Sequence, residues 1–346
     1  MLSFFFKPKK RRKRVVYIVG RFPQLSQTYI RNEIAALGPE YEVKIIGVSR
    51  PNFPDPNPLA HEIISDRKQI LQAVQEFKPT VIHSHYVVWM DLVNEISTAA
   101  GIPYTTRSHS FDVLGPMYGQ PHEAWAKVPH FVNKDNCLGL LCFPFARQAL
   151  VDIGVRDDKI IDAPPVVATK KFFNRDHNGT AIINVGAALP KKKMDDFIML
   201  SRKVRELEFN LYALGHISNE LKQFNSDNDG QVNFPHPVGF DEMPSVYKHH
   251  GWLIYTACPT LKTVGWPMAI AEAQASGLGV CMANIRSDLR EYVGDSGYFY
   301  DDIGELQELI RKPVDQARRE AGFENAMKLD VEFHIDKLTS LWDKIK

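Results

Sequence analysis

Residues 264–277 combine residue types that can bind a nucleotide. Pro267 suits the first position of a short apolar helix, and Gly277 suits the position just beyond its end. A helix that starts after a glycine, here Gly265, gathers unpaired N–H groups and a partial positive charge, which favour a phosphate. Glu272 is the one carboxylate of this helix and can accept two hydrogen bonds from a ribose diol. The spacing therefore predicts a nucleotide site.

A run of lysines supplies a second indication of a phosphate. The apolar residues 181–185 predict a strand that Gly186 ends, and lysines occupy all of 191–193, just before a helix that begins near Asp195. Helix starts favour acidic residues, so three cations in this approach are unfavourable unless an anion balances them. The arrangement predicts a bound diphosphate.

A polar loop follows the first predicted strand of the N-terminal half. The buried strand 15–19 ends at Gly20, and Ser26 can cap a helix that runs to Leu37. Loops at the carboxyl ends of parallel strands line ligand crevices in open sheets. The loop between Gly20 and Ser26 is therefore a candidate for ligand binding.

Histidines mark the ends of two further strands. His83 and His85 end the strand 80–85 and share one face of it, so they could ligate a metal ion, but no cysteine or carboxylate accompanies them nearby. The strand 103–107 leads to His109. A lone histidine is more often structural, so the pattern alone leaves the role of His109 open.

The strands that carry these residues alternate with helical segments along the whole chain, which predicts an α/β protein. With 346 residues, 44% of them hydrophobic, the chain is long enough for two domains with separate cores. We expect a tail over 1–14, an N-terminal domain over 15–175, a C-terminal domain over 176–325 and a final helical segment over 326–346. One apolar stripe on that last segment is formed by Ile335, Leu338, Leu341, Trp342 and Ile345.

Several of these segments also match a family pattern. The sequence G-x-P-x-x-x-x-E-A-x-A-x-G from Gly265 to Gly277 resembles the donor-site signature of the retaining, family-4 type glycosyltransferases. Residues 22–30 resemble the F-P-x-L-S-x-T-x-I opening of members that assemble surface polysaccharides. The segment 107–112 resembles the family's T-x-H-G-x-D, and 186–193 its G-R-x-x-x-x-K-G. The resemblance implies the GT-B architecture, in which two doubly wound, Rossmann-like parallel-sheet domains face each other across a cleft.

The resemblance also implies a role for individual residues. The donor, a nucleotide-diphosphate sugar, would bind the C-terminal domain, and a hydroxyl acceptor would bind the N-terminal domain, onto which the last helix crosses back. No metal ion and no cofactor beyond the donor substrate are implied. Catalytic roles fall to His109 and Lys192; donor binding to Gly20, Gly186, Lys191, Lys192, Gly265, Trp266, Pro267, Met268 and Glu272; and the acceptor side to Arg21, Gln24, His85 and Arg107.

The chain departs from the family pattern at three donor positions. Val264 stands where the family has a second glutamate, which holds hydroxyls of the donor sugar. Ala187 replaces an arginine and Lys193 a glycine. These departures leave open the stereochemical outcome, and with it two other functions: a degenerate GT-B protein that binds nucleotide or glycan as a scaffold, and a nucleotide-sugar epimerase or hydrolase. The base, the sugar, the acceptor and the oligomeric state stay open as well.

Charge and composition bear on partners and location. Seven of the 42 basic residues lie between Lys7 and Arg14, so the rest of the chain has 35 against 41 acidic residues and no sign of a nucleic-acid-binding face. The tail 1–14, with its aromatic and basic residues, is either a solvated segment or an anchor for an anionic membrane. The four cysteines have no CxxC spacing and most lie in apolar surroundings, so we expect reduced core residues. No transmembrane or signal segment is recognised. We expect a cytoplasmic enzyme, peripheral to the inner membrane face if the tail binds, whose acceptor is a lipid-linked or polysaccharide precursor.

Overall fold

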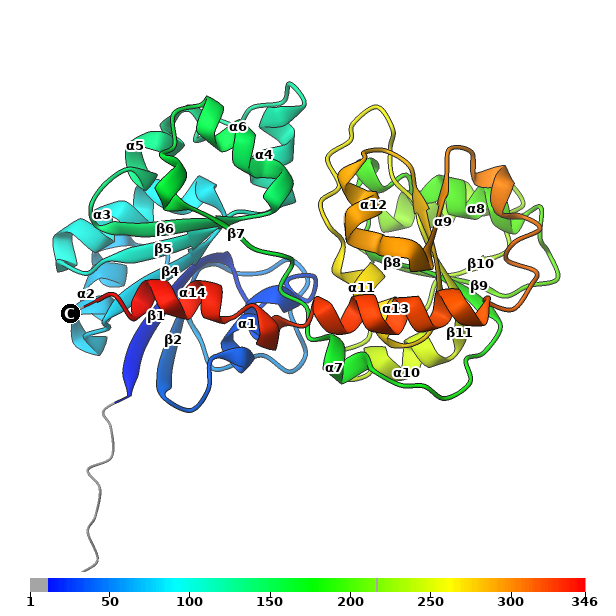
Figure 1. Ribbon diagram of the computed structural model, residues 1–346, viewed down its shortest axis with the longest axis horizontal. Coiled ribbons are helices and arrows are strands. Elements are labelled where there is room, and N and C mark those ends of the chain that lie inside the picture. Colours follow the sequence, from blue (N-terminus) through cyan, green and yellow to red (C-terminus); the bar gives the residue numbers. More distant parts are fainter. Residues whose placement is uncertain (1–11, 216, 346) are drawn as a thin grey trace, which may run out of the picture.

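The computed structural model describes residues 12–215 and 217–345 and contains two fully parallel sheets. The first sheet has the strand order β3-β2-β1-β4-β5-β6-β7, and the second has the order β10-β9-β8-β11-β12-β13. In each sheet the order reverses beside the first strand of the domain, which is the arrangement of a doubly wound fold. The predicted fold class, two Rossmann-like domains, is therefore confirmed, and Figure 1 shows them as two separate lobes.

The first sheet is built from buried apolar runs, because helices cover both faces of a parallel sheet and leave no polar face. Its strands are β1 (Lys13–Arg21), β2 (Tyr41–Ser49), β3 (Glu62–Ile63), β4 (Val81–His85), β5 (Tyr104–Arg107), β6 (Cys137–Cys142) and β7 (Ile160–Asp162). Its helices are α1 (Thr28–Ala36), α2 (Arg67–Phe77), α3 (Met90–Ala100), α4 (Ser110–Met117), α5 (Val128–Val132) and α6 (Arg147–Asp152).

The second sheet repeats the alternation around its own core. Its strands are β8 (Ala181–Ala187), β9 (Phe209–Leu214), β10 (Val232–Asn233), β11 (His250–Tyr255), β12 (Gly279–Ala283) and β13 (Gly297–Tyr300). The helices of the second half are α7 (Thr169–Phe172), α8 (Met194–Ser201), α9 (Ser218–Asp227), α10 (Met243–Lys248), α11 (Met268–Ala275), α12 (Asp288–Val293), α13 (Gln316–Lys328) and α14 (Asp336–Trp342).

Local details differ from the sequence expectations at three points. Ser26 does not cap α1, because the N-cap residue is Gln27 and no side chain accepts a hydrogen bond there. Gly186 does not end β8 but lies within it. Pro267 is the N-cap of α11 and not its first residue, whereas Gly277 follows the helix with φ of +80°, as a C-terminal glycine does. These differences move helix and strand ends by one or two residues and leave the topology unchanged.

The C-terminal segment joins the two lobes. In Figure 1, α13 lies against the second lobe and α14 against the first. Leu338, Leu341 and Trp342 of α14 are buried in the same cluster as Tyr17 of β1. The indole N–H of Trp342 donates to Thr105 Oγ1 of β5 at 3.0 Å. The chain therefore returns to the first domain after completing the second.

Residues 1–11, the larger part of the segment for which membrane binding is a prediction, lie outside the described residues, and β1 already begins at Lys13. Cys137, Cys142 and Cys281 are free and buried, as expected for reduced core residues, and Cys258 is half-buried. Over residues 12–215 and 217–345, no helix has the length and apolar character needed to cross a membrane.

Candidate active site

A cavity of about 410 Å³ lies between the two domains and is lined by both. The first domain contributes the start of α1, the segment 107–111 after β5 and the segment 163–166. The second domain contributes the segment 185–192 at the end of β8, together with α11 and the residues that precede it. Since these loops leave the carboxyl ends of strands beside the point where each strand order reverses, the cavity occupies the usual ligand position of such sheets.

The α11 wall brings a carboxylate and a glycine to the cavity. Glu272 is buried, and the hydroxyl of Tyr247 donates to its Oε2 at 2.9 Å. Burial raises the pKa of Glu272 to about 7, although the hydrogen bond from Tyr247 opposes the shift. Gly265 faces α4 of the other domain, where an added Cβ would lie 2.7 Å from Ser110 Cβ. Glycine at this position therefore permits the close approach of the two domains.

The neighbouring indole of Trp266 is fixed by contacts with α12. Its N–H donates to Asp288 Oδ2 at 2.8 Å, and its ring stacks on Tyr292 with the centroids 5.0 Å apart. Asp288 is also paired with Arg286, whose Nε lies 2.8 Å from Asp288 Oδ1. Arg286 is thus engaged with Asp288 at the back of this wall, and the loop before α11 is fixed in place.

Two of the three lysines reach the cavity from the segment after β8. Gly186 has φ of +138°, and an added Cβ would lie 2.2 Å from Lys192 Nζ, so glycine makes room for that ammonium. Lys191 Nζ donates to the carbonyl oxygen of Thr263 at 3.0 Å. Lys193 does not line the cavity, because its Nζ is paired with Asp196 Oδ1 at 2.8 Å.

Their electrostatics favour an anion. Removal from water, together with the nearby charge of Lys191, lowers the pKa of Lys192 to about 7. Removal from water also lowers the pKa of Lys191 to about 8, with a contribution from Arg286. Two ammonium groups that are desolvated and close together are stabilised when a negatively charged ligand binds between them. This is the electrostatic signature expected of a diphosphate site.

His109 lines the opposite wall, from the first domain. Its Nε2 lies 2.9 Å from Nδ1 of His85, which is fully buried beneath it and does not reach the cavity. Burial lowers the pKa of His109 well below its usual range and that of His85 to about 4, so both imidazoles are neutral at neutral pH. The backbone N–H of His109 donates to Asp112 Oδ1 at 2.6 Å, which fixes the start of α4.

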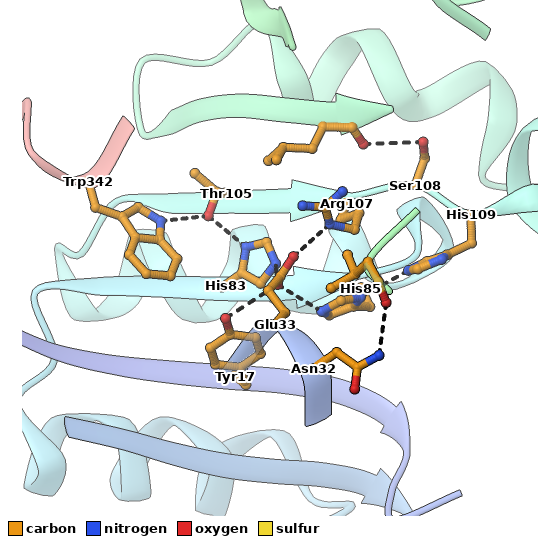
Figure 2. A network of polar contacts seen from close by, with 12 residues as sticks. Tyr17, Asn32, Glu33, His83, His85, Thr105, Arg107, Ser108, His109 and Trp342 are labelled. Atoms are coloured by element: carbon orange, nitrogen blue, oxygen red, sulfur yellow. Dashed lines mark hydrogen bonds and ion pairs between the residues drawn. The ribbon is translucent and has the colours of Figure 1, made fainter. Parts of the chain in front are cut away.

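A carboxylate that sequence reasoning missed organises this wall. Glu33 of α1 is fully buried, and Arg107 Nε donates to its Oε2 at 2.7 Å. Nε2 of His83 and Nε2 of His85 lie 2.9 and 3.2 Å from its Oε1 (Figure 2). Burial pushes the pKa of Glu33 upward, but the Arg107 guanidinium and the imidazoles outweigh it and hold this pKa well below its usual range. Glu33 is therefore a buried anion paired with Arg107.

The sequence did contain a signal for Glu33. It lies three and four residues after Ile30 and Tyr29 and four before Leu37, on the apolar face of α1. A carboxylate at such a position is buried on folding and requires a partner. The partner could not be named, because Arg107 is 74 residues away in the chain.

Glu33, His83 and His85 also form a group of potential metal ligands, with ligand atoms within 4.8 Å of one another. The sequence expectation that no carboxylate accompanies the two histidines is therefore wrong in space, although it holds along the chain. A divalent cation here would have to share Glu33 with Arg107, leaving net positive charge in a fully buried position, which is costly. The pair of the Glu33 carboxylate and the Arg107 guanidinium is neutral, so burying it without a cation costs less free energy than burying it with one.

The structure gathers most, but not all, of the residues predicted to form the site. The predicted residues that line the cavity are Arg107, His109, Gly186, Lys191, Lys192, Gly265, Trp266, Pro267, Met268 and Glu272. Those outside its lining are Gly20, which packs against Trp89; Arg21, which is exposed; Gln24, whose Oε1 accepts from the N–H of Asn52; and His85. Aromatic and sulfur-containing residues that sequence reasoning missed also line it: Tyr29, Tyr86, Phe240, Met243, Tyr247 and Tyr255.

No protein-family model matches the chain, and no curated protein matches it in sequence. Solved structures match its fold. HepE from Anabaena, crystallised with UDP and glucose, has a TM-score of 0.72 at 13% identity and covers 94% of this chain and 98% of its own. Sucrose-phosphate synthase from Thermosynechococcus elongatus has a TM-score of 0.70 at 14% identity, covering 96% and 99%. The lipopolysaccharide outer core galactosyltransferase WaaB has a TM-score of 0.60 at 12% identity, covering 95% and 98%.

These matches extend over both domains and over nearly the full length of each partner chain. They agree with the two parallel sheets and with the cavity between them. The chain therefore has the GT-B fold of these glycosyltransferases, with two Rossmann-like domains facing each other across a cleft.

Proposed function

We infer that the protein is a glycosyltransferase that moves a sugar from a nucleotide-diphosphate sugar to a hydroxyl acceptor. The observation that carries this proposal is the position of Lys191 and Lys192 in the same cavity as the N-terminus of α11 and Glu272. The similar fold of HepE, which was crystallised with UDP and UDP-glucose, supports the same kind of donor. The fold of WaaB supports an acceptor that is a lipid-linked or polysaccharide precursor.

The donor would bind the second domain. Glu272 would accept hydrogen bonds from the ribose diol, while Lys191, Lys192 and the free N–H groups at the start of α11 would contact the diphosphate. The diphosphate gains negative charge as the glycosidic bond breaks. Preorganised cations and N–H groups stabilise that charge more in the transition state than in the ground state, which is the requirement for catalysis.

The acceptor would bind the first domain, with His109 at the reacting centre. A neutral imidazole there offers a polar edge without placing a positive charge near the forming oxocarbenium-like sugar. We propose transfer with retention of configuration and without a metal ion, with Lys192 in the charge-stabilising role. Membrane association through residues 1–14 belongs to the same proposal and is tested by deletion of residues 2–14 and a vesicle-binding assay.

The test is a nucleotide panel on the wild-type protein and two lysine variants. A selective rise in thermal stability with one nucleoside diphosphate identifies the donor base, since a ligand at about 100 times its Kd adds ~2.7 kcal/mol. Lys192→Ala should lose this shift and the release of nucleoside diphosphate from the matching nucleotide sugar. Lys222→Ala, which removes an exposed lysine of α9, is the matched control and should behave as wild type. No shift with any nucleotide, or full transfer by Lys192→Ala, would reject the proposal.

A further inference from the structure

We propose that the acceptor carries an anionic group, a carboxylate or a phosphate, and that the guanidinium of Arg107 binds it. The inference rests on the proposed function, because it concerns the acceptor side of the same cleft. It names a substrate class that neither the fold nor the donor site determines. Four observations on the first domain carry it.

The first observation is that one nitrogen of the Arg107 guanidinium, Nε, has a hydrogen-bond partner in the described protein, whereas the two terminal nitrogens do not. It is the last residue of β5, its relative exposure is 6%, and its Nε donates to Glu33 Oε2 at 2.7 Å. Among residues 12–215 and 217–345, neither of its terminal nitrogens, Nη1 and Nη2, donates to a protein acceptor. A buried guanidinium without partners for four of its N–H groups is costly unless a ligand or water accepts from them.

The second observation is where those N–H groups can find an acceptor. Neither terminal nitrogen is among the fully enclosed side-chain atoms without a partner, so both keep contact with open space. Arg107 lines the main cavity and also a neighbouring one of about 10 Å³, bounded by 163–166 and His334. The small cavity has room for a single water at most. Of these two cavities that Arg107 lines, the main one is therefore the one that can hold a larger ligand.

The third observation is the distribution of charge. The cavity is lined by the cations Arg107, Lys191 and Lys192, and among the described lining residues Glu272 is the one acidic side chain. Burial raises the pKa of Glu272 to about 7 and lowers that of Lys192 to about 7, which weakens both charges at neutral pH. The two lysines lie on the second domain, where a donor diphosphate would occupy them. Arg107 lies on the first, where Glu33 balances its charge but leaves the N–H groups of its terminal nitrogens for the other substrate.

The fourth observation concerns the N-terminus of α1, which lines the cavity on the side of the first domain. Residues 25–29 contribute to the cavity, and α1 begins at Thr28 with no side chain that caps its free N–H groups. An uncapped helix N-terminus adds a partial positive charge to the cavity that Arg107 also lines. Glu33 of the same helix accepts from Arg107 Nε at 2.7 Å, which fixes one edge of the guanidinium. Together they form a preorganised site for a planar or tetrahedral oxyanion, which a guanidinium binds with paired N–H groups.

The position of this site fits an acceptor. Arg107 and His109 lie two residues apart at the end of β5, and both line the cavity. An anionic group bound by Arg107 would hold the acceptor beside His109, within reach of the sugar on the donor. Correct positioning of the two substrates is a large part of the rate enhancement in a group transfer.

The experiment is a titration of the full-length protein, first saturated with the nucleoside diphosphate that it binds, so that the lysines are occupied. Three probes are compared by isothermal titration calorimetry: methyl β-D-glucuronide, glucose 6-phosphate and the neutral methyl β-D-glucoside. We expect one of the two anionic probes to bind at least about tenfold more tightly than the glucoside, as loss of a charge-assisted hydrogen bond predicts. The glucuronide and the phosphate arms distinguish a carboxylate from a phosphate acceptor.

Variants assign the preference to Arg107. Arg107→Gln should remove the preference for the anionic probe, Arg107→Lys should retain part of it, and Arg156→Gln, on the surface beside Asp158, should leave it unchanged. Equal binding of anionic and neutral probes to wild type, no binding of either anionic probe, or an unchanged preference in Arg107→Gln would overturn the proposal. If Arg107→Gln does not fold, the wild-type and Arg107→Lys titrations decide. Failure of nucleotide binding itself would instead reject the proposed function.

Discussion

The hydroxyl of Tyr247 lies 2.9 Å from Glu272 Oε2 and donates a hydrogen bond to it inside the wall of the cavity. This bond only partly offsets the cost of burying the carboxylate, since burial still raises the pKa of Glu272 to about 7. The cavity wall therefore holds a buried carboxylate that could accept further hydrogen bonds from the hydroxyls of a ligand. A residue that costs stability in the free protein is a good candidate for ligand binding.

The first prediction follows from that cost. The folded-state pKa of Glu272 is raised, so its contribution to stability is full below its unfolded pKa of about 4.5 and is lost as the pH rises through about 7. Glu272→Gln has no charge to bury and should exceed wild type by about 1 to 3 kcal/mol in free energy of unfolding at pH 8, with a smaller difference at pH 5. Urea unfolding at both pH values measures this.

The same variant should bind nucleoside diphosphate more weakly, because a carboxamide accepts poorly from a diol. Glu324→Gln removes an exposed carboxylate of α13 and should change neither stability nor affinity. A Glu272→Gln variant that is less stable than wild type at pH 8, or that binds nucleotide equally well, would contradict the assignment.

The second prediction concerns proton uptake by the lysines. The pKa of Lys192 is lowered to about 7 and that of Lys191 to about 8, so at pH 8 Lys192 is mostly neutral in the free protein. A diphosphate favours the charged forms and raises both pKa values, so binding at pH 8 should take up protons, and binding at pH 6 should not. Calorimetry in two buffers of different ionisation enthalpy measures the uptake. Identical binding enthalpies in both buffers at pH 8 would argue against a diphosphate between these lysines.

The third prediction tests the contact between the domains. Gly265→Ala would place a Cβ 2.7 Å from Ser110 Cβ, so the domains must separate or the loop must shift. We expect transfer activity to fall by at least about tenfold, because misplacement by a fraction of an ångström is enough to impair group transfer. Gly322→Ala in α13 is the matched control: the nearest atom to its Cβ would be 3.5 Å away, so activity should be retained. Wild-type activity in Gly265→Ala would show that the observed approach of the domains is not the active one.

The fourth prediction is a double-mutant cycle on Glu33 and Arg107. Either single glutamine variant leaves a buried charge without its partner and should lower the free energy of unfolding by about 3 to 5 kcal/mol. The double variant should cost clearly less than the sum, which gives a coupling free energy above about 1 kcal/mol. The exposed pair Arg156–Asp158 should couple by less than about 1 kcal/mol. Additive effects for Glu33 and Arg107 would refute the pairing.

The sequence alone determined the features that depend on neighbours along the chain. Buried apolar runs placed the strands, and the position of Gly277 after a short helix was predictable because φ of +80° suits glycine. The α/β alternation places Lys191 and Lys192 after the carboxyl end of a strand and Glu272 in a helix near the same edge of the sheet. Their presence in one cavity could therefore be expected from the sequence. The resemblance of the motifs then pointed to the architecture that the structure confirms.

Only the tertiary structure decided which of these residues meet. Gly20 and Arg21 are the last two residues of β1 and Gln24 follows it, yet none of the three lines the cavity. Gly20 packs against Trp89, Arg21 is exposed, and Gln24 Oε1 accepts from the N–H of Asn52. The partnership of Glu33 with Arg107 and the contact of Gly265 with Ser110 join segments far apart in sequence. Local periodicity sets helices and strands, whereas strand order, side-chain packing and the approach of two domains set long-range contacts. A single sequence records those contacts only as residues that require a partner, such as a carboxylate on an apolar face.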